Sequence, residues 1–441
     1  MSRPTLVKAI GLVAYAVWCV APALAADPAA APGLREQFDA VAGHAQVRAA
    51  LDFIKADSAR TLAEQREIVV IEAPPYKEAV RARDYLRRFN EIGVGPARID
   101  SEGNVVVVRQ GSGKGPKLVI SAHLDTVFPA GTDLTVKEKD GRLYAPGIGD
   151  DTRGLVELLT MARALKATGI QTTGDIWFVA TVGEEALGNL RGVRALFREQ
   201  RDLDGFISID GNQPGRITYL AVGSQRYRVT YKGPGGHSFS AFGLPSAVHA
   251  LGRAIAKVAD LKTPSDPKTT FTVGTVKGGT SVNTIASEAS MELDMRSVQM
   301  PQLLDVERAV MAALRDAAAE ENARWGSQAI KVDIELVGAR PAGAQRPDAP
   351  IVQAATMALR AVGLEPVLEQ PGSTDANTPI SLGIPAMAVG RGGANGRVHT
   401  VDEWFDPKDA HLGPQKTLLT VLSLVGVEGV SKPLLTKASS P

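Results

Sequence analysis

The chain has 441 residues, of which 44% are hydrophobic and 22% charged, an ordinary globular composition. Its 49 basic and 48 acidic residues give a formal net charge of +1, which excludes a global field that would recruit nucleic acid or an anionic membrane. At roughly 150 residues per domain, the length predicts two or three domains.

The first 25 residues are predicted to form a secretory signal. Arg3 and Lys8 precede an apolar run, and the small-residue pattern at 23–25 predicts cleavage after that segment. A single-pass anchor is the alternative, but the short run and the nearby cleavage pattern favour a signal. The only cysteine, Cys19, lies in this segment, so the mature chain has no thiol. We therefore expect a secreted, periplasmic protein without stable membrane association after cleavage.

Helices and strands alternate through the first part of the mature chain, residues 26–222. Apolar periodicity predicts helices within 47–71 and 77–93. The later expected elements are strands at 104–110 and 117–123, a helix at 155–168, and strands at 175–183 and 205–211. Strands separated by helices predict an α/β fold with a mainly parallel sheet.

The pattern changes over residues 223–337. The expected elements are a strand at 226–233, a helix at 244–261, strands at 269–276 and 289–297, a helix at 301–321 and a strand at 329–338. This βαββαβ order is that of a ferredoxin-like domain with one sheet face buried under two helices. The α/β style resumes over 338–435, which predicts an inserted domain within a larger catalytic one.

Acidic and imidazole side chains recur where predicted strands stop. His123 and Asp125 follow the apolar run "LVIS". The others are Asp150 in "GIGDDTRG", Glu184 and Glu185 in "VGEEALG", Asp210 in "SIDG" and His399 in "RVHTVDEW". Each alone is compatible with a cap, a turn or a surface position. Together, at the carboxyl ends of strands, they predict a shared crevice whose donors suit a two-zinc hydrolytic site.

These motifs, in this order and with the inserted domain, resemble the zinc-dependent peptidase family that includes glutamate carboxypeptidase, peptidase T, aminoacylase and carnosinase. The resemblance covers nearly all of the mature chain. It implies two zinc ions (Zn2+) per chain, a short peptide or N-acyl amino acid substrate, and a homodimer formed through the inserted domain. The implied ligands are His123 and Asp210 for one zinc, Glu185 and His399 for the other, and Asp150 as the bridge.

Two further residues near the ligands have implied catalytic roles. Glu184 matches the family's general base, and its position beside a ligand leaves it free to take a proton from water and deliver it to the leaving nitrogen. The Asp125 side chain, two residues beyond His123, is expected to hold that imidazole in the metal-binding tautomer.

The inserted domain and a late loop add substrate-binding candidates. His237 in "GPGGHSFSAFG" matches a family histidine that crosses a dimer interface to stabilise the oxyanion, although it can instead cap the following helix. Arg296 matches an arginine that clamps a substrate carboxylate, with a surface salt bridge as the alternative. The remaining family matches are Asn283, Gly372, Ser373 and Thr374.

Two departures from the family pattern bear on the substrate. The residues after Asp150 are Asp151, Thr152 and Arg153 where lysine or asparagine is frequent, which weakens inference from that loop. Asp210 stands where some branches have glutamate, which favours the peptidase branches over the desuccinylase and aminoacylase ones. We therefore expect an exopeptidase or amidohydrolase. The alternatives are a deacylase or carbamoyl-amidohydrolase and, against the presence of Glu184, an inactive metal-dependent peptide-binding protein.

Overall fold

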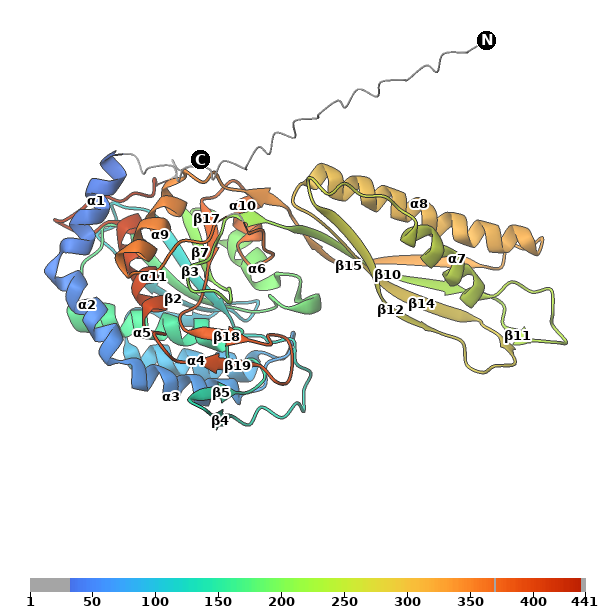
Figure 1. Ribbon diagram of the computed structural model, residues 1–441, viewed down its shortest axis with the longest axis horizontal. Coiled ribbons are helices and arrows are strands. Elements are labelled where there is room, and N and C mark those ends of the chain that lie inside the picture. The colour runs from blue at the N-terminus through green and yellow to red at the C-terminus, as the bar shows by residue number, and fades with distance from the viewer. Residues whose placement is uncertain (1–31, 369, 438–441) are drawn as a thin grey trace, which may run out of the picture.

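The computed structural model describes residues 32–437 except residue 369 (Figure 1). The predicted signal at 1–25, with Cys19, lies outside the described residues. Among the helices that are described, none combines the length and the apolar character needed to cross a bilayer.

A seven-stranded sheet forms the centre of the catalytic part of the chain. Its strands, in spatial order, are β1 (Ala97–Ile99), β2 (Val105–Arg109), β6 (Asp175–Thr181), β3 (Lys117–His123), β7 (Gly205–Ile209), β17 (Ala386–Val389) and β8 (Ile217–Thr218). The four strands from β6 to β17 are parallel, whereas β1, β2 and β8 pair antiparallel at the edges. The prediction of a mainly parallel sheet is confirmed, with an antiparallel margin that strand–helix alternation alone did not indicate.

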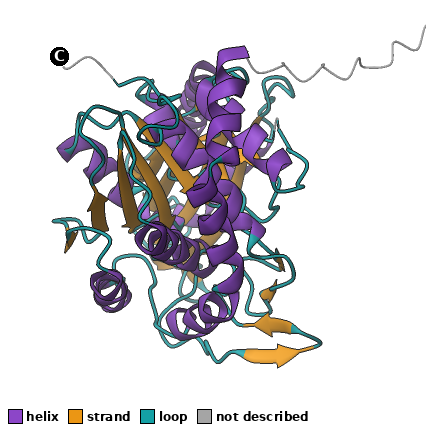
Figure 2. Cartoon of the chain, turned by 90° about the vertical axis from the view of Figure 1, so that its left-hand side faces the viewer, coloured by secondary structure: helices purple, strands orange, loops and turns teal. Residues whose placement is uncertain are grey.

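Helices cover both faces of this sheet because successive strand residues point to opposite sides. In β3, Leu118 and Ile120 join one apolar cluster and Val119 joins another. The helices that contribute to the first cluster are α1 (Pro32–Gly43), α2 (Ala45–Ala56), α3 (Ser58–Val69), α4 (Ala79–Ile92), α5 (Thr152–Thr168), α9 (Pro350–Ala361) and α11 (Leu412–Val425). The opposite face packs against α6 (Arg191–Glu199) and α10 (Asn377–Ser381). Figure 2 shows the helices stacked over the strands.

The helical pattern predicted over 47–71 is divided into α2 and α3. Asp57 lies at the break, where its backbone nitrogen donates to the carbonyl of Phe53 at the end of α2. The Asp57 carboxylate accepts a hydrogen bond of 2.8 Å from the buried Arg163 of α5. The break between the helices places the Asp57 carboxylate where it pairs with the buried Arg163 guanidinium. Local hydrophobic periodicity cannot reveal this contact, because the two residues are far apart in the sequence.

The inserted segment folds around a separate four-stranded antiparallel sheet (Figure 1). Its elements are β10 (Gly223–Lys232), α7 (Ala247–Ala259), β12 (Thr269–Gly278), β14 (Glu288–Ser297), α8 (Met300–Arg324) and β15 (Lys331–Arg340). The spatial order β12-β14-β10-β15 is that of the ferredoxin-like fold, as predicted. Alternate residues of β14 are buried against the two helices, which leaves Glu292, Asp294 and Arg296 on the opposite face.

Short strands join distant parts of the chain beside the main sheet. β18 (Ala394–Gly396), β19 (Trp404–Asp406), β5 (Arg142–Tyr144) and β4 (Lys137–Lys139) form one small sheet in that order. Two ribbons pair β9 (Leu220–Ala221) with β16 (Gly343–Ala344), and β11 (Gly236–His237) with β13 (Thr284–Ile285). Because β5 pairs with β19, the loop at 145–151 lies beside the loop at 397–403.

Candidate metal centre

The predicted ligands converge at the carboxyl edge of the parallel strands. His123 is the last residue of β3, Glu184 and Glu185 follow β6, and Asp210 follows β7. Parallel strands present these ends at one edge of the sheet, where α/β proteins bind their ligands. Asp150 reaches the same edge from the loop before α5.

One carboxylate lies between two imidazoles. His123 Nε2 is 3.1 Å from Asp150 Oδ1, and His399 Nε2 is 3.2 Å from Asp150 Oδ2. His399 Nε2 also lies 2.9 Å from Glu185 Oε1. A carboxylate with each oxygen facing a different imidazole has the arrangement that a bridging metal ligand requires.

The remaining donors complete the cluster. Potential ligand atoms of His123, Asp150 and Glu185 lie within 4.8 Å of one another, and so do those of His123, Glu184 and Asp210. The structure thus brings all five predicted ligands together. The Glu184 carboxylate also lies among the possible metal donors, beside the predicted ligand Glu185. The role predicted for Glu184 from the sequence is that of the general base.

The group that holds the His123 ring differs from the prediction, which assigned this role to the Asp125 side chain. Its Nδ1 donates to the backbone carbonyl oxygen of Asp125 at 2.9 Å, whereas the Asp125 carboxylate is 3.8 Å away. That carboxylate instead accepts hydrogen bonds from the backbone nitrogens of Glu184 and Glu185, at 3.1 and 2.8 Å. The side chain of Asp125 therefore holds the loop that bears the two glutamates, and its main chain sets the imidazole tautomer.

Two residues that the sequence analysis did not single out hold the Asp150 loop. Glu403 is fully buried, and its carboxylate accepts from the backbone nitrogens of Gly147, Gly149 and Asp150 at 2.8–3.0 Å. Arg391, which follows β17 and is 1% exposed, donates to Asp150 Oδ1 at 2.8 Å. Arg391 follows a strand, as the predicted ligands do, so the same strand-end signal identifies it once arginines are considered with the acids and histidines.

Arg391 also serves other acidic side chains of the site. Its guanidinium lies 3.0 Å from Asp151 Oδ1 and 3.6 Å from Asp210 Oδ1. Asp151 additionally caps α5 by accepting from the backbone nitrogen of Gly154, the role that a paired aspartate often has.

The titration properties of the cluster show how much negative charge it concentrates. Burial, reinforced by Asp150, raises the pKa of Asp210 to about 6. Hydrogen bonds to Asp150 and Glu185 raise the pKa of His399 to about 10. Burial would raise the pKa of Asp150 too, but Arg391 and the histidines outweigh it and hold that pKa well below its usual value. This concentration of carboxylates and imidazoles suits a divalent cation.

Glu184 is buried beside Arg340, the last residue of β15. Its Oε1 accepts from Arg340 Nη1 at 3.0 Å, and the same nitrogen lies 3.1 Å from Ser373 Oγ. Burial raises the pKa of Glu184 to about 7 although Arg340 opposes the shift. A carboxyl group poised near neutrality suits proton transfer. Beneath it, Asp375 is buried with its Oδ1 unpaired among the described residues, and burial raises its pKa to about 8.

A cleft of about 340 Å³ opens over this cluster. Arg296 from the inserted domain lines it, as does the loop of Gly372, Ser373 and Thr374. These four predicted substrate-binding residues therefore meet at the site. An adjoining cavity of about 510 Å³ extends the cleft over β12 and β14, with Arg296 and His399 on its wall.

Two predicted residues lie elsewhere in the same chain. His237 and Asn283 are exposed and belong to neither cavity lining. The ribbon β11–β13 around them lies at the end of the inserted domain away from the main sheet (Figure 1). His237 Nδ1 accepts from the backbone nitrogen of Phe239 at 3.2 Å, so within one chain the imidazole caps a turn.

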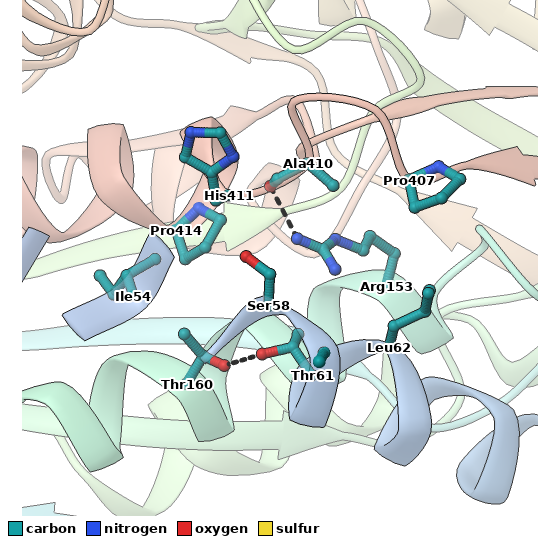
Figure 3. A pocket seen from close by; sticks show the side chains of 11 residues that line it. Ile54, Ser58, Thr61, Leu62, Arg153, Thr160, Pro407, Ala410, His411 and Pro414 are labelled. Carbon is teal, nitrogen blue, oxygen red and sulfur yellow. Dashed lines mark hydrogen bonds between the residues drawn. The ribbon is translucent and has the colours of Figure 1, made fainter. Parts of the chain in front are cut away.

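Arg153 does not line the cleft over the metal centre. It lines a separate cavity of about 260 Å³, where it donates to the carbonyl oxygen of Ala410 (Figure 3). It also pairs with the buried Glu157 at 2.9 Å. The departure from the family pattern at this position therefore concerns the packing of α5 and not the substrate cleft.

Comparison with known proteins identifies the family. A family model described as peptidase family M20/M25/M40 matches residues 119–421. The succinyl-diaminopimelate desuccinylase of Corynebacterium glutamicum is 27% identical over 338 residues, which cover 74% of this chain and 87% of that protein.

Solved structures are similar in fold. A tripeptidase from Staphylococcus aureus matches with a TM-score of 0.68 and 24% identity, over 82% of this chain and 97% of that one. A dinuclear metal-binding peptidase from Bacillus subtilis matches with a TM-score of 0.60 and 18% identity, over 84% of this chain and 99% of that one. The resemblance predicted from the motifs is confirmed: the chain belongs to peptidase family M20/M25/M40 and is a metal-dependent hydrolase of peptide or acyl-amino acid bonds.

Proposed function

We propose that the protein is a two-zinc hydrolase that removes a terminal residue from short peptides or an acyl group from N-acyl amino acids. The observation on which this rests is the placement of the Asp150 carboxylate between His123 and His399, with Glu185 and Asp210 beside it. Imidazole nitrogen and carboxylate oxygen are donors that zinc accepts.

Each residue then has a defined task. His123 and Asp210 would hold one ion, Glu185 and His399 the other, and Asp150 both. Two zinc ions held there would lower the pKa of water and polarise the scissile carbonyl. Glu184, with its raised pKa, takes the proton of the attacking water and returns it to the leaving nitrogen. Arg340 holds the Glu184 carboxylate in place.

Substrate binding falls to the remaining cleft residues. Arg296 projects from the polar face of β14 and binds a substrate carboxylate through its planar fork. Its Nε donates to Asp294 at 2.7 Å, which fixes the orientation of the guanidinium. The backbone and hydroxyls of the loop at 372–374 contact the substrate beside the metals.

His237 is proposed to act in a partner subunit. It is remote from the cleft of its own chain, and the side chains around it include Phe239 and Val282, which are 87% and 103% exposed. Apolar groups exposed on this scale favour an interface. We propose a homodimer in which His237 and Asn283 complete the partner's site, within a protein that the leader sequence directs to the periplasm.

The two forms of the proposed function, removal of a terminal residue and removal of an acyl group, differ in the amide bond that is cleaved. Asp210 favours a peptidase, whereas the relatives include succinyl-diaminopimelate desuccinylases and solved peptidases. A turnover screen of di- and tripeptides against N-acyl amino acids, on metal-stripped protein with and without added zinc, tests the proposal. We expect zinc-dependent release of an amino acid. Full turnover by the stripped protein would refute metal catalysis, and zinc binding without any turnover would favour a peptide-binding protein.

A further inference from the structure

The residues that line the cleft over the metal centre include five arginines and four acids. Besides Arg391, which is bound to Asp150, Asp151 and Asp210, four guanidinium groups line it. They are Arg216, Arg226, Arg296 and Arg340. They come from different elements and meet only in the folded chain.

Three of the four share two carboxylates. Arg340 pairs with Glu184 at 3.0 Å. Arg226 and Arg296 both pair with Asp294, at 2.9 and 2.7 Å. One carboxylate cannot neutralise two guanidinium groups, so this pair retains one positive charge, in the position that suits the first carboxylate of a substrate.

Arg216 has no ionic partner of its own. Within the described part of the chain, no carboxylate lies within 4.0 Å of its guanidinium. Its Nε donates to Thr218 Oγ1 at 2.8 Å, and one Nη donates to the carbonyl of Pro371 at 3.2 Å, while its Nη1 has no acceptor there. The head group is thus held in a fixed orientation with a donor left over on the wall of the cleft.

The neighbouring glycine keeps Arg216 close to the substrate loop. A Cβ atom at Gly372 would lie 3.1 Å from Arg216 Nη2 and 2.9 Å from Thr218 Cγ2. A side chain at position 372 would therefore displace the Arg216 guanidinium or Thr218, whereas glycine lets the guanidinium lie against the start of the substrate loop. Arg216, which interacts with Asp210 only beyond ion-pair distance in the described part of the chain, therefore adjoins the residues assigned to the substrate, on the side of the cleft formed by β8.

We propose that the cleft selects substrates with two carboxylates, and that Arg216 binds the second while Arg296 binds the first. This inference rests on the proposed hydrolytic function and deepens it by naming the substrate class. The second carboxylate belongs either to the acyl group, as in an N-dicarboxyl amino acid, or to an acidic side chain. The shared chemistry is a dianion that bears one amide bond.

Matched pairs of substrates distinguish these two sources. N-succinyl-alanine is compared with its succinamyl analogue for an acyl-side carboxylate, and alanyl-glutamate with alanyl-glutamine for a side-chain carboxylate. In each pair only a carboxylate is exchanged for an amide. Because a hydrogen bond to a charged group adds about 1.5–3 kcal/mol, we expect roughly a 10- to 100-fold preference in kcat/KM for the dianion in one pair.

Variants assign the preference to Arg216. In Arg216→Met the selectivity ratio should fall towards one, mainly through KM for the dianion, and Arg216→Lys should retain part of it. Arg228→Met is the matched control, since Arg228 lies on β10 outside both cavity linings and pairs with surface glutamates. It should leave the ratio unchanged. If Arg216 only supports the loop at 370–374, Arg216→Met lowers kcat/KM equally for both members of a pair, and the proposal is overturned.

Binding provides a readout without turnover. Titration calorimetry on the full chain, metal-free and zinc-loaded, compares glutarate with its monoamide. Tighter binding of glutarate in the wild type, lost in Arg216→Met, supports the proposal. Equal affinities of the wild type for glutarate and for its monoamide, in both the metal-free and the zinc-loaded protein, overturn it. If glutarate is preferred but no amide substrate is cleaved, the proposed hydrolytic function fails while the dianion site remains.

Discussion

The Oε1 atom of Glu403 lies 2.8 Å from the backbone nitrogen of Asp150, and it is also 2.9 Å from the nitrogen of Gly149. Glu403 follows His399 by four residues, so a single loop contributes a proposed metal ligand and a support for the bridging one. The orientation of Asp150 thus depends on a carboxylate that touches no metal donor atom.

Replacing Glu403 by glutamine should weaken the metal centre without removing a ligand. The amide keeps one acceptor but directs an NH2 group at a backbone N–H, which leaves buried groups unpaired at a cost of about 1–3 kcal/mol in unfolding free energy. Zinc affinity should fall roughly 10- to 100-fold, as for other supports of metal ligands. Denaturation and zinc titration measure both effects.

The neighbouring Asp402→Asn is the matched control for this substitution. Asp402 is exposed and pairs with the exposed Arg397 at 3.0 Å, so its loss should alter neither quantity measurably. Equal zinc affinity in wild type and Glu403→Gln would show that the Asp150 loop does not need this support.

Glu184→Gln should separate catalysis from metal binding. The substitution keeps the shape but removes the group that accepts a proton, so kcat should fall by at least ~10²–10⁴-fold. Zinc content should change little, because the five proposed ligands remain. His123→Ala is the contrasting variant and should lose both zinc and activity. Normal turnover by Glu184→Gln would assign water activation to another residue.

The metal-free protein should lose stability as the pH rises from 5 to 8. Burial raises the pKa of Asp210 to about 6 and that of Asp375 to about 8, so folding favours their protonated forms. This stability is fully present below the unfolded pKa, about 3.9, and is lost as the pH passes through the folded values. His399, with its pKa raised to about 10, acts in the same direction above about 6.5.

Urea denaturation of stripped and zinc-loaded protein at pH 5 and pH 8 measures this dependence. Zinc should stabilise the protein more at pH 8 than at pH 5, because zinc binds the deprotonated forms of its ligands and Asp210 has lost its proton by pH 8. Asp375→Asn should reduce the loss between pH 6 and pH 8. A metal-free protein that is more stable at pH 8 than at pH 5 would contradict the assignment of buried, protonated carboxyl groups.

The sequence predicted elements and ligands through different physical rules. Alternation in β14 and helical spacing in α7 indicated the ferredoxin-like sheet because each pattern is local. His123, Asp210 and Glu185 were found because parallel strands end at one edge.

The residues that the sequence analysis missed depend on long-range packing. Arg340 and Arg216 are ordinary arginines in sequence, and only the fold shows that one pairs with Glu184 and the other lies beside Gly372. Asp125 was identified correctly as a neighbour of His123, but which of its oxygens would face the ring depends on backbone geometry. No sequence pattern specifies that choice.

The last prediction concerns the proposed completion of each site by His237 of a partner subunit. His237→Ala should reduce kcat by roughly 10²–10³-fold if the imidazole stabilises the oxyanion.

Mixing this variant with Glu184→Gln under conditions that exchange subunits should restore activity to about a quarter of the wild type, because half the dimers are mixed and each has one intact site. His249→Ala, an exposed histidine on α7 of the same domain, should remain active and is the control. Capture of one variant through an affinity tag carried only by the other confirms the exchange. If exchanged dimers show no recovery, His237 does not act across an interface.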